Sequence, residues 1–149
     1  VRINGLSARL RAEARRDETA RRLMTIPGVG PVCAVALAAL APPVSSFSKG
    51  RDFAARIGLV PRQNSSGGKA RLGRTSKMGQ RDLRRLLIIG ATSVVRWQAR
   101  HGAPAGSWMA RMPATKPKML VAVALANKIA RVAWALMRGD GVYRAPATA

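Results

Sequence analysis

Apolar residues recur at helical spacing along most of the chain, and this pattern predicts its main elements. Residues 81–100 form an amphipathic helix with a basic start. Its apolar stripe consists of Leu83, Leu86, Leu87, Gly90, Val94 and Trp97. A second long helix is predicted over about 118–138, and Gly139 ends it. The residues it is expected to bury are Leu120, Val121, Ala124, Leu125, Ile129, Val132 and Leu136.

Shorter helices are predicted in the first half of the chain. Residues 1–22 mix apolar positions at helical spacing with charged residues, as in an exposed or coiled helix. Residues 23–42 contain a Pro-Gly-Val-Gly turn that opens directly into an Ala/Val-rich helix. Residues 46–62 fit a short helix capped near Ser46 or Ser48.

The pattern of the whole chain favours helices, because the alternation that is typical of strands is poor. We therefore predict an all-α fold, a compact helical domain with a basic Ser/Gly loop. The domain is expected to span residues 23–143, after the end of a linking helix in residues 1–22 and before a disordered tail, 144–149. Because the chain begins with Val inside a helical pattern, we expect it to belong to a longer protein.

The charge of the chain points to a polyanionic partner. The 149 residues include 27 Lys and Arg against six Asp and Glu, a formal net charge of +21. Phosphate neutralisation makes nucleic acid the leading candidate, and an anionic membrane surface is the competing one. The longest apolar run, 119–126, is far shorter than the roughly 20 residues that span a bilayer. The single cysteine, Cys33, excludes a disulfide framework or zinc cluster within one chain and is expected to be buried.

The turn at residues 26–30 is a first candidate for phosphate binding. Gly28 and Gly30 let the backbone approach a ligand closely, and the following helix directs free N–H groups toward it. The pattern resembles the hairpin of the helix-hairpin-helix families, which grip a DNA backbone without reading bases. The alternative is an ordinary turn between two helices.

The loop at residues 61–81 is the second candidate. Cations cluster in and after it, at Arg62, Lys69, Arg71, Arg74, Lys77, Arg81, Arg84 and Arg85. Only Asp52 and Asp82 lie near, too few carboxylates for a metal site. A hydroxyl of Ser65, Ser66 or Ser76 could instead attack a phosphodiester, with the cations stabilising the developing charge. The alternative is a mobile basic loop that only binds phosphates.

Three blocks of sequence, in order, resemble the C-terminal domain of the insertion-sequence one-ten family of transposases. They are LMTIPGVGPVCAVALAAL, FAARIGLVPRQNSSGGKARLGRTSKMGQRDLRRLLIIGA and KPKMLVAVALANKIARVAWALMR. The resemblance runs from about Arg22 to Tyr143. It implies an N-terminal RuvC-like domain with a carboxylate site for a divalent metal, joined by a coiled-coil helix to a domain like this one. It also implies DNA as substrate and a structured bridge RNA that pairs with donor and target.

The resemblance also implies roles for residues of the loop. The family's serine nucleophile, which becomes covalently linked to a DNA end, falls on Ser66, with Ser65 as the alternate. Lys69, Arg71, Arg74 and Lys77 would neutralise phosphates, while Ser76 would hydrogen-bond a phosphate or cap the following helix. Without the carboxylate domain, no metal or other cofactor is expected in this chain, and it is expected to be inactive alone. We expect a homo-oligomer in the bacterial cytoplasm, associated with the nucleoid.

Other residues and other functions stay open at this point. His101 is a weak candidate for a general base. Trp97, Trp108 and Trp134 could stack on unpaired bases, although core packing is the better prediction for Trp97 and Trp134. The competing functions are a non-catalytic module that grips a DNA or RNA backbone and a structural RNA-associated protein of ribosomal type.

Overall fold

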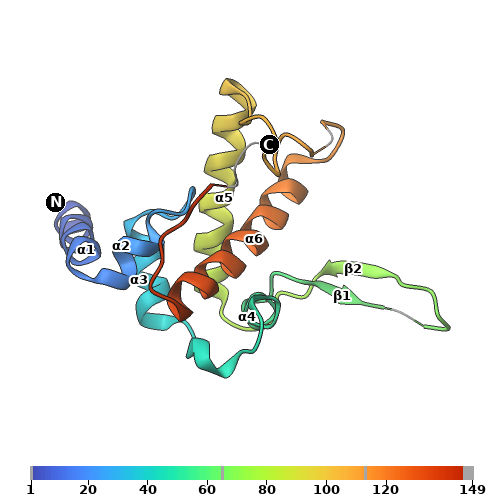
Figure 1. The fold of residues 1–149 in the computed structure, drawn as a ribbon, viewed down its shortest axis with the longest axis horizontal. Helices are drawn as coiled ribbons and strands as arrows, with labels where there is room; N and C mark the ends of the chain where they lie inside the picture. The colour runs from blue at the N-terminus through green and yellow to red at the C-terminus, as the bar shows by residue number, and fades with distance from the viewer. Residues whose placement is uncertain (1, 65, 113, 146–149) are drawn as a thin grey trace.

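The chain folds into a helical body from which a short β-hairpin projects (Figure 1). The computed structural model describes residues 2–64, 66–112 and 114–145. Its helices are α1 (Arg2–Arg16), α2 (Glu18–Leu23), α3 (Pro31–Leu40), the 3-10 helix η1 (Val44–Ser46), α4 (Gly50–Ile57), α5 (Arg81–His101) and α6 (Lys118–Arg138). The strands are β1 (Pro61–Gln63) and β2 (Leu72–Thr75). The prediction of a mostly helical domain is confirmed.

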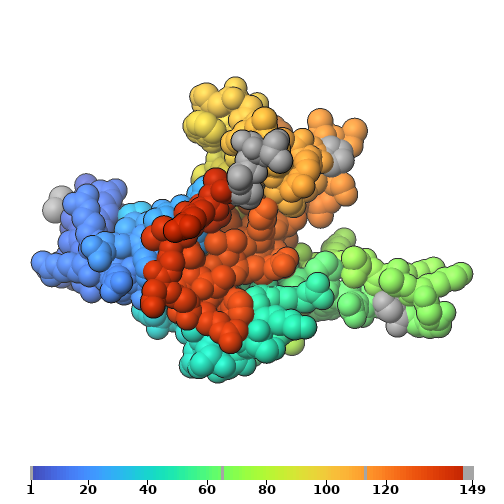
Figure 2. Space-filling view, viewed as in Figure 1, coloured from blue at the N-terminus to red at the C-terminus, as the bar shows by residue number. Residues whose placement is uncertain are grey.

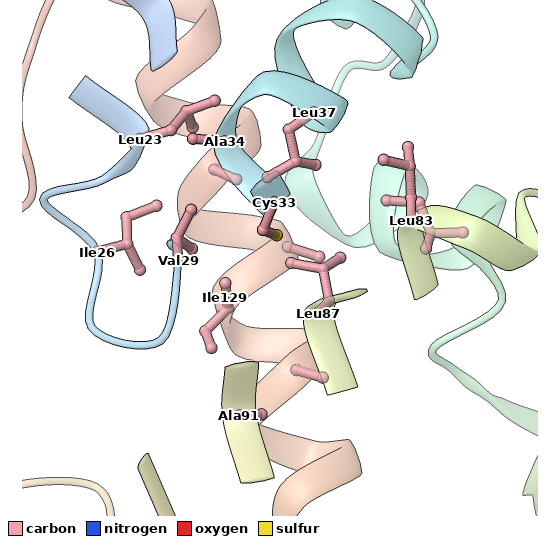
Figure 3. Packing of buried hydrophobic residues seen from close by; sticks show 14 of the residues in the cluster. Leu23, Ile26, Val29, Cys33, Ala34, Leu37, Leu83, Leu87, Ala91 and Ile129 are labelled. Atoms are coloured by element: carbon pink, nitrogen blue, oxygen red, sulfur yellow. The ribbon is translucent and has the colours of Figure 1, made fainter. Parts of the chain in front are cut away.

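The core lies where α5 and α6, which run in opposite directions, meet α3 and the turn before it (Figure 1). Leu87 of α5, Ile129 of α6 and Cys33 of α3 are buried in it (Figure 3). Along α6, Ala122, Ala126, Ala130 and Ala133 are also buried, and these small side chains let neighbouring helices approach closely. The two long helices therefore form the centre of the domain.

The predicted apolar stripes hold in the middle of α5 and α6 and fail toward their ends. Leu83 and Leu87 are buried, as predicted. Trp97 is 57% exposed and Leu120 is 54% exposed, so the prediction that both are buried is wrong. At this end of the two helices a smaller cluster buries the nearby Val95, Val121 and Ala122 instead. The end of α6 at Gly139 is confirmed.

The composition of α6 also satisfies the test for a membrane span. Among the described residues, this is the one helix that is long and apolar enough to cross a bilayer, with a mean hydropathy of 1.6. A core helix passes the same test. The packing of α6 against α4 and α5 accounts for its apolar character in this fold.

The segment predicted as one helix over residues 1–22 is two helices. Asp17 interrupts it, because its side-chain Oδ1 accepts hydrogen bonds from the backbone N–H groups of Thr19 (2.8 Å) and Ala20 (3.4 Å). Ala14 and Ala20 are buried in the common core. The second half of this segment therefore packs onto the domain.

The helix predicted over residues 46–62 is shorter than expected. It begins at Gly50 with Lys49 as its N-cap residue, so the prediction of a cap at Ser46 or Ser48 is wrong. The Ser48 hydroxyl instead donates to the Asp52 carboxylate at 3.3 Å. Gly58, in the left-handed conformation at φ 81°, ends α4.

The Pro-Gly-Val-Gly turn packs directly on the backbone of α5. Gly28 has a φ of 93°, and its carbonyl oxygen lies where a Cβ on Gly90 would be. A Cβ on Gly28 would in turn come within 3.0 Å of the Gly90 carbonyl oxygen. These two glycines bring the turn and α5 into backbone contact. Packing therefore accounts for Gly28, while Gly30, the exposed N-cap residue of α3, has open space beside it.

Two glycine-to-alanine changes in helices should have opposite effects on stability, because Gly90 contacts Gly28 and Gly5 contacts nothing. Gly90→Ala should destabilise the domain by about 1–3 kcal/mol, because the new methyl group clashes with a backbone carbonyl that cannot move aside. Gly5→Ala, in α1 with nothing nearby, should stabilise it by about 0.5–1 kcal/mol. Urea unfolding followed by circular dichroism measures both. Equal effects of the two changes would contradict this packing.

Cys33 is buried in the core, as predicted. Burial raises the pKa of its thiol from 9.0 to about 11. Because the unfolded chain loses the thiol proton at lower pH, the resulting stability is fully present below pH 9. It falls by up to about 3 kcal/mol between pH 9 and 11. Urea unfolding across this range should therefore show a steeper decline for the wild type than for Cys33→Ala, and parallel declines would contradict the shift.

Candidate nucleic-acid interface

The basic loop is a β-hairpin, which the sequence analysis missed. β1 and β2 pair antiparallel, with Pro61 opposite Thr75 and Gln63 opposite Leu72, and an irregular register between the two pairs. Figures 1 and 2 show the hairpin as an arm that projects from the helical body. The exposure of all residues of β1 fits this position, since the strands have no partner layer. The loop is therefore a hairpin arm that carries its cations away from the core.

A two-residue turn forms the end of the arm. Ser66 and Lys69 face each other across it, and the Lys69 N–H donates to the Ser66 carbonyl at 3.3 Å. Gly67 and Gly68 lie between them, with φ angles of 61° and 75°. Positive φ at both central residues matches the turn that suits the twist of a hairpin, and only glycine adopts it freely. Ser-Gly-Gly-Lys was thus the sequence signal for the hairpin.

Two glycines fix the base of the arm on the end of α4. A Cβ on Gly58 would clash with the Met78 carbonyl oxygen, and one on Gly79 would clash with the Arg56 carbonyl oxygen. Arg84 of α5 closes the same junction, because its Nη1 donates to the carbonyls of Ile57 (3.1 Å) and Met78 (3.4 Å). These contacts set the direction of the hairpin. Sequence reasoning missed the positioning role of Gly58 and Gly79, although both stand in the motifs that carry the family resemblance.

The structure brings the predicted phosphate-binding cations together on the arm and at its base. Along the arm lie Arg62, Lys69, Arg71 and Arg74, and all four are exposed. Lys77, Arg81 and Arg85 follow at the base and are exposed too. Asp52 and Asp82 are the nearest acidic residues along the sequence on either side, so residues 53–81 carry no negative side chain. The result is a positively charged arm.

Two predicted contact residues of this group are engaged inside the protein. Arg84 is half-buried and holds the junction described above. Ser76 is half-buried as well, and its hydroxyl oxygen accepts a hydrogen bond from the Met78 N–H at 3.5 Å. Gln80, rather than Ser76, is the N-cap residue of α5. Phosphate binding by Arg84 and Ser76 stays a prediction, and the exposed cations are the more accessible contacts.

Ser66 is exposed beside the turn, at the far end of the arm. Among the described residues, no side chain hydrogen-bonds to its hydroxyl and no carboxylate lies on the arm. The alternate, Ser65, lies outside the described residues. Within the described part of the chain, the Ser66 hydroxyl is thus exposed on a cationic arm without a proton acceptor beside it.

The remaining candidates lie elsewhere. His101 is the last residue of α5, and its ring stacks on Trp97, with 4.7 Å between the ring centroids. That end of α5 is remote from the hairpin in Figure 1. Trp134 packs against the core, as predicted, and its indole N–H donates to the Val44 carbonyl at 3.2 Å. In the described part of the chain, no cluster of three or more His, Cys, Asp or Glu could hold a metal ion.

Several known transposases are similar to this chain in sequence. Residues 20–104 match the transposase IS116/IS110/IS902 family. The chain is 46% identical over 144 residues to a probable family 20 transposase of Pseudomonas aeruginosa, covering 97% of this chain and 43% of that protein. It is 40% identical over 127 residues to the transposase for insertion sequence element IS1328 of Yersinia enterocolitica, covering 85% of this chain and 38% of that protein.

A third relative extends the comparison. The transposase for insertion sequence element IS1111A of Coxiella burnetii is 37% identical over 142 residues, covering 95% of this chain and 39% of that protein. The chain therefore spans about two fifths of the length of these relatives. Since the family match covers more than half of the chain and includes the hairpin, the chain belongs to the IS116/IS110/IS902 family of transposases.

Proposed function

We propose that this chain is the C-terminal, DNA-binding part of a transposase and that its hairpin delivers the Ser66 hydroxyl to a DNA phosphodiester. The observation that carries the proposal is the arm itself. It holds an exposed serine at a tight turn, among exposed cations and without a single carboxylate from residue 53 to residue 81. Such a surface attracts a phosphate backbone and leaves the hydroxyl free to approach phosphorus.

The proposed reaction exchanges one phosphodiester bond for another. The Ser66 Oγ forms a bond to phosphorus, and the bond from phosphorus to the oxygen of the leaving nucleotide breaks. The hydroxyl proton passes to an acceptor, and the leaving oxygen takes up a proton. Arg62, Lys69, Arg71 and Arg74 stabilise the negative charge that develops on the phosphate oxygens. Resealing by a second DNA end reverses the same bond changes and frees Ser66.

The proton acceptor is the part of this chemistry that the described residues do not offer beside Ser66. The family resemblance implies an N-terminal carboxylate domain with a divalent metal, and we propose that this domain supplies the acceptor. The relatives, of which this chain spans about two fifths, are long enough for one. We further propose a guide RNA, assembly as a homo-oligomer and action in the bacterial cytoplasm, at the nucleoid.

The turn between α2 and α3 is proposed as a second contact to the DNA backbone. Gly30 leaves open space at the exposed start of α3, where free N–H groups can meet a phosphate. Gly28 contributes by holding this turn on α5. This turn would hold the DNA backbone at a point on the helical body, apart from the arm.

The second candidate function is a binding module that holds nucleic acid without reacting with it. The absence of a proton acceptor near Ser66 among the described residues favours this alternative, and the charge of the arm suffices for it. The two functions are separated by mixing the full-length protein with its element's RNA and junction DNA and denaturing the mixture. A protein–DNA adduct that survives denaturation supports the transposase chemistry, whereas salt-sensitive binding without an adduct supports the binding module.

A further inference from the structure

A second basic surface lies on α6, apart from the hairpin. Figure 2 looks onto this face, where α6 (orange to red) lies between the C-terminal segment (dark red) and the segment that precedes α6 (orange), with α4 (turquoise) below. A groove of about 940 Å³ runs over it. Among the described residues, five cations and no Asp or Glu line the groove. The cations are Lys49, Arg51, Lys128, Arg131 and Arg144. An anionic ligand is therefore favoured.

Aromatic and apolar side chains make the floor of this groove different from an ordinary basic patch. Trp108, Trp134 and Tyr143 line it together with the cations. A smaller apolar slot of about 100 Å³ lies next to the groove, because Trp108, Lys128, Val132 and Tyr143 line both. The slot extends inward to Val94 and Leu125. A ligand that fits both parts must combine negative charge with a flat apolar group.

Gln98 adds a polar group to the inner wall of the slot. Its side-chain oxygen is buried and has no hydrogen-bond partner among the described residues. A buried amide oxygen without a hydrogen-bond partner lowers the stability of the fold. A ligand that donates a hydrogen bond to it regains this free energy on binding. A small rotation of the Gln98 side-chain amide toward the slot would let it form a hydrogen bond with the polar edge of a ligand ring.

Lys128 lines both the slot and the groove. Its Nζ lies 5.6 Å from the centroid of the Trp108 ring. Burial lowers the pKa of Lys128, and the nearby charges of Arg111 and Arg131 lower it further. A phosphate at this position would relieve the repulsion among the three cations. The slot and its opening thus present an aromatic face, an amide and a cation in one place.

We propose that this groove binds a single-stranded nucleic-acid segment and that the slot takes one unpaired base, stacked on Trp108, with Gln98 at its polar edge. The phosphates beside that base lie on Lys128, Arg131 and Arg51. Stacking on an aromatic side chain with cations along the backbone is how proteins hold single strands. A duplex cannot place a base in the slot, because its bases are already paired and stacked.

The test compares strands that have the same phosphates with and without bases. Fluorescence anisotropy measures the binding of ten-nucleotide single strands and of an abasic strand of equal length. The hairpin variant Lys69→Gln/Arg71→Gln/Arg74→Gln serves as the background, so that the arm contributes little. The strand with bases should bind at least about tenfold more tightly than the abasic strand, and Trp108→Ala should remove this preference. The same titrations are made with DNA strands and with RNA strands. Tighter binding of one kind identifies whether the groove binds DNA or RNA.

Two matched variants and one measurement without substitution make the test decisive. Trp97→Ala removes an exposed tryptophan outside the groove and should keep the preference. Gln98→Leu should reduce the preference while leaving binding of the abasic strand unchanged. In the wild-type chain, strands with 5-iodouracil should cross-link to Trp108 or Tyr143 on irradiation. Equal binding of both strands by the hairpin variant, or cross-links confined to the hairpin, would overturn the proposal whether or not Ser66 is the nucleophile.

Discussion

Ser66→Ala is expected to abolish the covalent protein–DNA adduct of the full-length protein. Alanine lacks the oxygen that forms the bond to phosphorus, so the loss should be at least roughly 10³-fold, the scale seen when a nucleophile is removed. Binding of junction DNA should change little, because the cations of the arm remain. The measurement is the amount of labelled DNA that migrates with the protein under denaturing conditions.

The comparison with other serines makes this result specific. Ser65→Ala should retain the adduct if Ser66 is the nucleophile. Ser45→Ala changes an exposed serine of η1 on another part of the chain and serves as the matched control. If Ser66→Ala formed as much adduct as the wild type, the hydroxyl of another residue would have to carry the reaction.

Neutralising three cations of the arm, in Lys69→Gln/Arg71→Gln/Arg74→Gln, is expected to have the second largest effect. Each phosphate contact that is lost should lower the slope of log K against log salt by about 0.9, and three should lower it by about 2.7. At about 0.1 M salt the affinity for duplex DNA should fall roughly 100- to 1,000-fold. Titrations at several salt concentrations measure the slope and the affinity together.

A variant with the same net charge controls for the field of the whole protein. Arg2→Gln/Arg9→Gln/Arg11→Gln also removes three positive charges, all of them exposed on α1. It should change the affinity by much less, because these arginines lie on a separate helix. If both triple variants lost the same affinity and the same slope, binding would depend on net charge rather than on the arm.

The helical part of this fold was predictable because its signals are local. The two long helices carry sustained apolar stripes, and α5 begins at Arg81 and α6 ends before Gly139, as predicted. The exposure of Trp97 and Leu120 was not predictable in this way. Periodicity indicates the apolar face of a helix, but it does not fix which of the neighbouring apolar residues is buried, and here these are Val95, Val121 and Ala122.

The hairpin and the groove required the three-dimensional structure. The strands of the arm contain Pro, Gly and Arg and lack a buried face, so no alternation marks them. Their signal is the Gly67–Gly68 turn, which fits a basic Ser/Gly loop without strands equally well. The groove on α6 combines Trp108 with Lys128 and with Lys49, which are far apart in the sequence. No local pattern predicts such a combination.

The most direct measurement is to find where the DNA is attached. Trypsin would release residues 63–69, QNSSGGK, from the adduct, and fragmentation of this peptide in a mass spectrometer separates Ser65 from Ser66. We predict a nucleotide remnant on Ser66. A remnant on Ser65 or on any other residue would contradict it.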